Sequence, residues 1–363
     1  MPVTLGVTRQ YEFTGNDLNN RGCLFPRDTR NSVFVQFAGV NTKQIASDPA
    51  KYLAFPFMLK LGSSIVVLYS DGDAHASSDR QIMTRSDDNG ASWSSVVFFE
   101  NTAPGVYNTS LLTGLLAVNE YAVFKVWAVK NVAGALTVAQ VPTVVDSGVT
   151  YALWSAVINS ATTGTIYRTG YGSNGTNTQC GLLQSTDGGF TWTFKSLIFS
   201  GAGLNFSEAA IIRTTGNNLV AVCREDTGAS NPLYYATSAD DGATWSSATL
   251  IPTTTINGRQ PNLIKTTNGR YILCTGDRAG TSGIGGGGED IFGTDETGIA
   301  MTTSADCQAW GFRTMLAGTY SSDGGQPFAV ETTANRVCVV FYHRRGLNKQ
   351  PVIASTTLDT GEL

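Results

Sequence analysis

Hydrophobic positions along the chain fall into short runs that are separated by joints rich in Gly, Asn, Asp and Ser. In the segment 55–99, the runs 55–61, 65–70, 81–86 and 93–99 predict four strands. Their joints are a Gly-Ser pair at 62–63, a polar loop at 71–79 and a compact turn at 87–92. The same order of runs returns at 209–250 and at 262–315. The pattern predicts an all-β chain built from four-stranded antiparallel meanders.

A repeated turn precedes the fourth run of these units. The pattern Ser-x-Asp-x-Gly-x-Ser/Thr-Trp occurs at 86–93, 185–192 and 238–245, and a shorter copy without the Gly lies at 304–310. An Asp in this position accepts backbone N–H groups across the turn, and Gly supplies a left-handed backbone. The Trp opens the next strand and offers an apolar face for packing. These residues are therefore interpreted as structural, without a catalytic role.

The spacing of this turn indicates a ring of repeated units. The copies start at 86, 185, 238 and 304, so the gaps are 99, 53 and 66 residues. The first gap is about twice the second, which predicts a unit without the turn near 99–145. Units of about 50 residues are typical of propeller blades. We predict a six-bladed β-propeller of four-stranded antiparallel blades over 46–363. Residues 1–45 form an N-terminal segment that closes the last blade, for example with a strand at 32–37, or serves for attachment.

The blade map collects the unusual polar residues on one face. Joints of an up-and-down meander alternate between two faces, so the loops between strands 2 and 3 lie opposite the repeated turns. Arginine forks bind carboxylates, and paired carboxylates can divide acid and base roles. This mixture predicts a site for an acidic sugar or another polar glycan; the alternative is that the charges form ion pairs that join the loops. The residues on this face are Asp71, Asp73, His75, Asp79, Arg80, Glu208, Arg224, Glu225, Asp226, Arg259, Asp277, Arg278, Tyr320, Asp323, Gln326, His343, Arg344 and Arg345.

Composition narrows the classes of function. Charged residues make up 14% of the chain and the net charge is −4, so a broad basic surface for nucleic acid is not expected. The six cysteines include no Cys-x-x-Cys pair and there are two histidines, so the sequence predicts neither a metal site nor a cofactor. The chain lacks an apolar run long enough for a membrane span and the features of a signal peptide, which predicts synthesis in the cytosol.

The repeated turn is similar to the Asp-box, and the chain from about residue 50 onward resembles the sialidase superfamily of six-bladed propellers. In that family an arginine triad grips the carboxylate of sialic acid, an Asp is the acid/base, and a Tyr activated by a Glu is the nucleophile. The segments 207–210 and 219–224 resemble the part that holds the Glu and the second arginine, here Glu208 and Arg224. The resemblance implies Tyr320 as nucleophile and Asp79 as acid/base, with Asp73 as the alternative.

The resemblance also implies Arg278 as the third arginine, with Arg259 as the alternative. The first arginine is a departure, because the family's Phe-Arg-Ile-Pro-like segment reads Leu53-Ala54-Phe55-Pro56 here. A methyl group at Ala54 cannot hold a carboxylate, so the sequence departs from an ordinary exo-acting sialidase. Endo-acting sialidases of bacteriophages tolerate an altered set of catalytic residues. Further candidates for substrate contacts on the same face are Asp277, Asp323, Gln326 and Arg344.

The composition, rich in Gly, Thr, Ser and Asn, also resembles that of phage tail fibres and tailspikes. This second resemblance implies a receptor-binding protein that is assembled into a virion tail as a homotrimer and contacts a bacterial surface polysaccharide. The first hypothesis is therefore glycan recognition, with or without cleavage. The second is an active glycosidase that uses Tyr320, Glu208 and Asp79. The third is a structural propeller that binds another protein.

Overall fold

The protein is described by a computed structural model over residues 41–61, 63–74, 80–94, 97–100, 116–120, 125–132, 135–140, 142–227, 231–253, 255–277, 298–311, 313–318, 324–344 and 350–359. Every regular element in these ranges is a β-strand. Within the same ranges we find no helix that could span a membrane.

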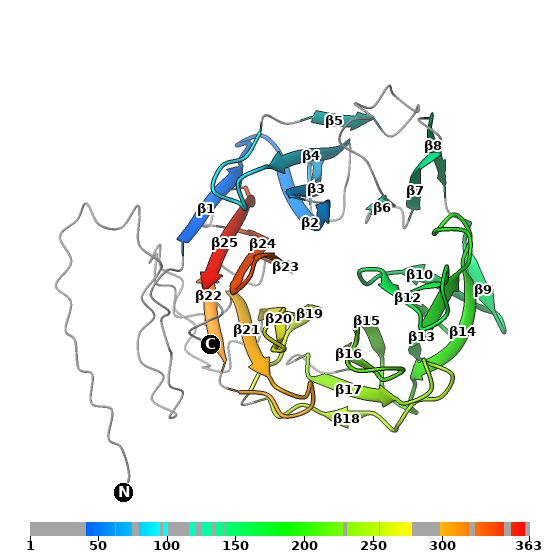
Figure 1. Ribbon diagram of the computed structural model, residues 1–363. Coiled ribbons are helices and arrows are strands. Elements are labelled where there is room, and N and C mark those ends of the chain that lie inside the picture. Colours follow the sequence, from blue (N-terminus) through cyan, green and yellow to red (C-terminus); the bar gives the residue numbers. More distant parts are fainter. Residues whose placement is uncertain are drawn as a thin grey trace, which may run out of the picture.

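Five sheets of four or more strands form blades that follow one another around a ring (Figure 1). Each blade is an antiparallel meander whose first strand lies toward the middle of the ring. Blade 1 contains β2 (Tyr52–Leu61), β3 (Ser64–Gly72), β4 (Arg80–Ser86) and β5 (Val97–Glu100). Blade 4 contains β15 (Phe206–Arg213), β16 (Leu219–Glu225), β17 (Leu233–Ser238) and β18 (Thr249–Leu250). Blade 5 contains β19 (Arg259–Lys265), β20 (Tyr271–Asp277), β21 (Gly298–Ser304) and β22 (Thr314–Gly318).

A sixth sheet lies between blades 1 and 3 in the ring (Figure 1). It has three described strands, β6 (Leu116–Glu120), β7 (Lys125–Val132) and β8 (Ala135–Gln140). These strands fall within the segment for which the spacing of the repeated turn predicts a unit without that turn. The predictions of an all-β chain and of a propeller are confirmed, with five blades and a three-stranded sheet among the described residues.

Blade 6 combines strands from distant parts of the chain. It contains β23 (Gly324–Thr333), β24 (Arg336–His343) and β25 (Val352–Asp359), and its outer strand is β1 (Asn41–Ala46). β1 runs antiparallel to β25, with Asn41 opposite Thr357 and Ala46 opposite Ile353. The segment 32–37, which the hydrophobic pattern suggests for this place, lies outside the described residues. Pairing with β1 covers an edge of β25 that would otherwise be free to bind another chain.

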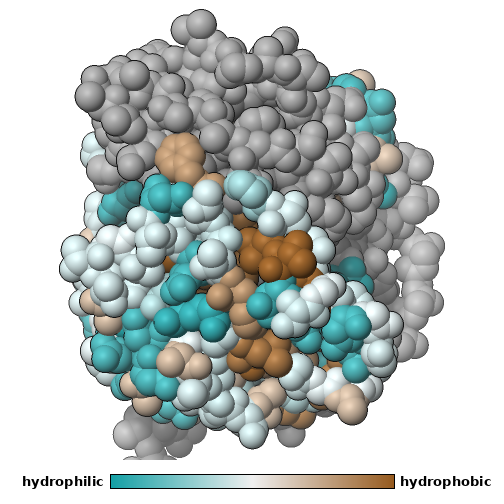
Figure 2. Space-filling model, turned by 90° about the vertical axis from the view of Figure 1, so that its right-hand side faces the viewer, coloured by the Kyte–Doolittle hydropathy of each residue, from teal (hydrophilic) through white to brown (hydrophobic). Residues whose placement is uncertain are grey.

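Blade 3 carries a hairpin that the sequence analysis did not predict. Its main strands are β10 (Val149–Leu153), β12 (Ile166–Ser173), β13 (Thr178–Ser185) and β14 (Thr193–Phe199), and β9 (Val144–Asp146) and β11 (Ile158–Asn159) are added. A Cβ at Gly172 would lie 2.1 Å from the carbonyl oxygen of Thr150, so glycine lets the β9–β10 hairpin lie close to the blade. The side of the ring with β9 and β14 faces the viewer in Figure 2, where hydrophobic surface lies among hydrophilic residues. Val145 and Leu197 are 62% and 41% exposed.

The repeated turns join the third and fourth strands of the blades. In the copy in blade 4, Asp240 accepts the backbone N–H of Thr244 at 2.9 Å and its hydroxyl at 2.5 Å. The backbone N–H of Gly242 donates to Ser238 Oγ at 2.8 Å, and the copies at Gly90 and Gly189 make the same bond. The bond from the backbone N–H to the aspartate is the one that the sequence pattern predicts, and the bond from the glycine N–H to the serine was not predicted.

Two details of the turns differ from the sequence prediction. In the short copy, Cys307 takes the place of the glycine, with φ at 65° and its N–H bonded to Ser304 Oγ at 2.9 Å. The tryptophans precede the fourth strands and do not open them: β5 begins at Val97, four residues after Trp93 (97 − 93). The tryptophan rings pack into the core before the chain becomes extended: Trp245 packs between blades 3 and 4, and Trp192 packs against the β9–β10 hairpin.

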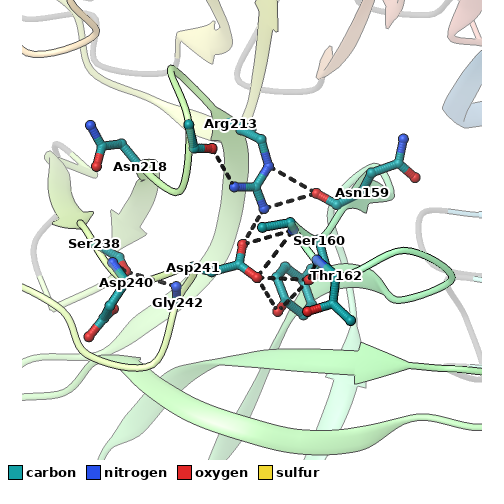
Figure 3. A network of polar contacts seen from close by, with 12 residues as sticks. Asn159, Ser160, Thr162, Arg213, Asn218, Ser238, Asp240, Asp241 and Gly242 are labelled. Atoms are coloured by element: carbon teal, nitrogen blue, oxygen red, sulfur yellow. Dashed lines mark hydrogen bonds and ion pairs between the residues drawn. The ribbon is translucent and has the colours of Figure 1, made fainter.

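The turn of blade 4 also ties two blades together (Figure 3). Asp241 accepts hydroxyl bonds from Ser160 at 2.7 Å and from Tyr167 at 2.8 Å, both in blade 3. It also forms an ion pair with Arg213, whose Nη2 donates to the carbonyl of Asn159 at 3.0 Å. Because every member has a protein partner, this network on the repeated-turn face is structural.

The hydrophobic core is divided among the contacts between neighbouring blades. Separate clusters join blade 1 to blade 6, blade 3 to blade 4, blade 4 to blade 5, and blade 5 to blade 6. A further cluster lies between the β9–β10 hairpin and blade 3. Blades 3 to 6 therefore bury both of their faces, which fixes the ends of their strands in space.

Candidate functional site

The first strands of four blades share the same bulge at the face opposite the repeated turns. In each bulge, two residues of the first strand lie opposite one residue of the second strand. Such bulges bend a strand and redirect its side chains. The shared register allows positions to be matched from blade to blade. The bulges lie between Ala54 and Phe57, between Phe206 and Ala209, between Arg259 and Asn262, and between Gly325 and Phe328.

The bulge of blade 4 differs from the other three in its second inserted residue. Blades 1, 5 and 6 have a proline there, preceded by a residue with left-handed backbone: Phe55, Gln260 and Gln326 have φ values of 57°, 55° and 43°. Blade 4 has Glu208 in the place of the proline. The bulge thus brings a carboxyl group into the ring of first strands.

Glu208 is a buried carboxyl group. Its side chain is 3% exposed, and its Oε2 accepts a bond from Arg224 Nη1 at 2.6 Å. The same oxygen accepts the backbone N–H of Gln260 in blade 5 at 3.0 Å. Burial raises the pKa of Glu208 above the ordinary value for Glu, and the positive charge of Arg224 offsets part of the rise. A carboxyl group with a raised pKa suits proton transfer.

Arg224 joins two carboxylates of its own blade. Besides its bond to Glu208, it forms a fork on Asp226, with Nε bonded to Oδ1 and Nη2 to Oδ2, the latter at 2.9 Å. Ser207 Oγ donates to the same Oδ2 at 2.6 Å. The fork that a ligand carboxylate would need is therefore occupied by Asp226. The alternative interpretation of Arg224, an ion pair that joins the loops, describes its contacts in this structure.

The site extends from blade 4 into blades 5 and 6. Arg259 donates from Nε to Asn231 Oδ1 at 2.8 Å. Burial raises the pKa of Glu208, and the positive charge of Arg259 acts against this rise, as that of Arg224 does. Gln260 continues the chain of contacts, because its Oε1 accepts the backbone N–H of Gln326 at 2.6 Å. Both glutamines are buried. Three blades are thus linked by polar contacts on the predicted face.

A small pocket lies next to these contacts. The Phe57 and Phe328 rings in its wall have centroids 4.5 Å apart, and the indole of Trp154 stands edge-on to Tyr171 at 5.9 Å. Aromatic faces with a few amide groups are typical of small-molecule pockets. Among the described residues, no three metal-ligating side chains gather in one place. The pocket is lined by Phe57, Trp154, Gln260, Asn262, Gln326 and Phe328.

The predicted site residues have different outcomes. Glu208, Arg224, Arg259 and Gln326 lie in the linked network described above. Arg344 follows the end of β24 on the same face and is half-buried. Asp277 ends β20, at the register position that Asp71 occupies in blade 1 and Asp226 in blade 4. Asp79, Arg278, Tyr320 and Asp323 lie outside the described residues, so their roles stay predictions.

The place of the family's first arginine is filled by apolar packing. Ala54 is 1% exposed and belongs to the core between blades 1 and 6. The residue of blade 5 at the same register position as Ala54 is Arg259. A guanidinium group therefore does occur at this position, but in blade 5 and not in blade 1. Asp73, the alternative acid/base, is 77% exposed and forms an ion pair with Lys51 at 2.7 Å.

Sequence reasoning missed three partners in this site. The contact between Arg224 and Asp226 has a signal in the sequence, because the two residues are two positions apart and a strand directs such side chains to the same side. The contacts of Asn231 with Arg259 and of Gln260 with Glu208 have no such signal, since they form only where blades 4 and 5 meet. Spacing along the chain does not encode such contacts between blades.

No protein-family model matches the sequence, and no curated protein matches it. Solved structures do match. A protein of unknown function from Dyadobacter fermentans has a TM-score of 0.67 at 17% identity, covering 89% of this chain and 100% of that one. An α-L-arabinanase of Penicillium chrysogenum, complexed with arabinobiose, has a TM-score of 0.60 at 13% identity, with coverages of 89% and 98%. The NanB sialidase of Streptococcus pneumoniae has a TM-score of 0.56 at 15% identity, with coverages of 88% and 71%. At these identities the likeness shows the fold, a β-propeller similar to that of sialidases.

Proposed function

We propose that this chain is a glycan-binding β-propeller whose site also supports glycoside hydrolysis. The observation that carries the proposal is the network of buried Glu208 with Arg224 and Asp226, next to a pocket with aromatic walls. The similarity to an arabinanase and to a sialidase, which are glycan-directed enzymes, supports it. Ala54 and the occupied fork of Arg224 favour a polar glycan that does not depend on three arginines around a carboxylate.

A printed array of neutral and acidic bacterial surface polysaccharides tests glycan binding. We expect the fluorescently labelled chain to bind at least one polymer, and Trp154→Ala to weaken that binding about tenfold because a stacking face is lost. Tyr235→Ala, a half-buried aromatic residue between blades 4 and 5, is the matched control and should leave binding unchanged. Failure of the unaltered chain to bind any polymer would reject the proposal.

Hydrolysis is the second candidate function, and the raised pKa of buried Glu208 favours it. The resemblance to sialidases assigns attack on the anomeric carbon to Tyr320, removal of the Tyr320 proton to Glu208, and protonation of the leaving oxygen to Asp79. Glu208→Gln should then abolish release of reducing ends from a bound polymer while the circular dichroism spectrum stays unchanged. Full activity in this variant would contradict the assignment.

We extend the proposal to the whole assembly. The sheet β6–β8 is proposed to be the second blade of a six-bladed ring, since it occupies the gap between blades 1 and 3 (Figure 1). The low charge and the Gly-, Thr-, Ser- and Asn-rich composition support a place in a virion tail as a homotrimeric receptor-binding protein. Light scattering on the purified chain tests the trimer, and a single-chain mass would contradict it.

A further inference from the structure

A second concave surface lies on blade 3, away from the pocket at the middle of the ring. One wall is the β12–β13 turn and the other is the link from β14 to β15. We call it the amide groove and define it by its side chains. They are Asn174, Asn177, Thr178, Gln179, Leu197 and Ser200.

The shape of the groove is set by bonds within its own walls. Asn174 Oδ1 accepts the backbone N–H groups of Thr176 at 3.0 Å and Asn177 at 2.9 Å, which holds the turn. Gln179 Nε2 donates to the hydroxyl of Tyr151 at 2.6 Å, so its carboxamide is fixed in orientation. The walls are thus built before any ligand arrives, which reduces the entropy lost on binding.

The chemistry of the groove is polar and uncharged. None of its lining side chains is ionisable, and Leu197 adds apolar surface that is 41% exposed. Among the hydrogen bonds of the described residues, none uses the side chains of Asn177, Thr178 or Ser200. Amide and hydroxyl groups both donate and accept, as sugar hydroxyls do. Phosphate or carboxylate groups would need cations that this lining lacks.

The groove is connected to the candidate site through Asn205. The Asn205 side chain accepts the backbone N–H of Thr178 at 2.9 Å, at the groove wall. Its backbone N–H donates to Glu225 Oε1 at 3.1 Å, and its carbonyl accepts the N–H of Asp226 at 2.8 Å. Asp226 holds the fork of Arg224. Asn205 therefore contacts the groove wall and the end of β16, where Asp226 holds Arg224, so the groove and the candidate site lie on the same face of the ring.

We propose that the amide groove is a second saccharide subsite, which takes a neutral, hydroxyl-rich stretch of a polysaccharide whose neighbouring units occupy the central pocket. This inference rests on the proposed function and sharpens it: the ligand is an extended polymer, and a mono- or disaccharide fills the central site alone. The contribution of the groove is visible only with long chains.

The test compares polymer and disaccharide binding in groove variants. The probes are the printed neutral and acidic polysaccharides and the disaccharide released from each by partial acid hydrolysis. In the double variant Asn177→Ala with Ser200→Ala, affinity for the polymer should fall about tenfold, the loss expected from two hydrogen bonds, while disaccharide affinity stays unchanged. The matched control, Asn217→Ala with Ser247→Ala, alters exposed residues on the repeated-turn face and should change neither.

The possible results separate the two proposals. Polymer binding that is lost in Trp154→Ala but unchanged in the groove variant would overturn the groove and leave the central site standing. Equal losses for polymer and disaccharide in the groove variant would also overturn a separate subsite. No binding by the unaltered chain would overturn the proposed function and the groove together. Thermal unfolding of each variant confirms that the fold is retained.

Discussion

At the scale of single residues, Glu208 makes the stability of the chain depend on pH. Its pKa is raised in the folded state, chiefly by burial, so folding favours the protonated form. The stability that it contributes is complete below the ordinary Glu pKa of about 4.3 and is lost as the pH rises through the raised value. In Glu208→Gln this loss should be absent, so the free energy of unfolding should fall less between about pH 5 and 8 than in the unaltered chain.

Urea unfolding at several pH values measures this difference. Glu331→Gln alters a carboxyl group at the far end of β23 and serves as the control, because it lies outside the network of Glu208. Parallel pH profiles for Glu208→Gln and the unaltered chain would contradict the assigned environment of Glu208.

Arg224 gives a second prediction at this scale. Its side chain is 15% exposed and it neutralises Glu208 and Asp226. Removal of the guanidinium leaves Asp226 and the buried carboxyl group of Glu208 without their positively charged partner, so Arg224→Ala should lower the free energy of unfolding by about 3 kcal/mol. Arg85→Ala breaks a more exposed ion pair with Asp87, in which the side chains are 31% and 60% exposed, and should cost less than about 1 kcal/mol. Equal losses in guanidinium chloride unfolding would contradict the role of Arg224.

At the scale of elements, the repeated turn depends on its glycine for two separate reasons. Gly242 has φ at 78°, and a Cβ there would lie 2.3 Å from Leu182 Cδ2 in blade 3. Gly216 has φ at 54° but nothing within 4 Å of such a Cβ. Gly216→Ala should therefore cost about 1 kcal/mol for the backbone alone, and Gly242→Ala about 3 kcal/mol for backbone and overlap together. Chemical denaturation of both variants measures the loss of free energy of unfolding. Similar losses at both positions would argue against close packing of the turn on blade 3.

The aspartates of the turns predict acid sensitivity. Bonds from Ser92 hold the pKa of Asp88 down at about 2, and bonds from Thr244 lower that of Asp240. Lowered pKa values stabilise the fold above the ordinary Asp pKa of about 3.9, and this contribution is lost as the pH falls through the folded-state values. In Asp88→Asn with Asp240→Asn, the thermal midpoint should therefore be lower at neutral pH and should fall less between about pH 4 and 2. Asp146→Asn is the control; if the double variant has the acid profile of this control, the turns are not the source.

The repeated elements were predictable and the contacts between them were not. The turn is a local motif, so its spacing located the blades, and the resemblance to sialidases singled out Glu208 and Arg224. The bulges also have a local signal in the sequence, an X-Pro pair at Phe55-Pro56, Gln260-Pro261 and Gln326-Pro327. By contrast, the β9–β10 hairpin can pack against β12 only because Gly172 leaves room for the backbone of Thr150. Similarly, Gln260 contacts Glu208 only where blade 5 packs against blade 4.

At the scale of the whole molecule, the ring is closed by six residues of β1. A chain without residues 1–46 loses this strand and exposes the edge of β25, so its thermal midpoint should fall by at least about 5 °C and it should aggregate. A chain without residues 1–40 keeps β1 and serves as the control. Calorimetry and size-exclusion chromatography measure both effects. Identical behaviour of the two shortened chains would show that β1 does not hold the ring closed.

The direction of β1 also sets how the ring responds to mechanical force. Asn41, at the start of β1, lies opposite Thr357, close to the end of β25, so both strands leave the sheet at the same end. Tension applied between these two points does not load all the pairs of the ladder at once. It peels them apart in turn, first at Asn41 and last at Ala46, as a zipper opens. The fold therefore resists force least along the line that joins its two closing strands.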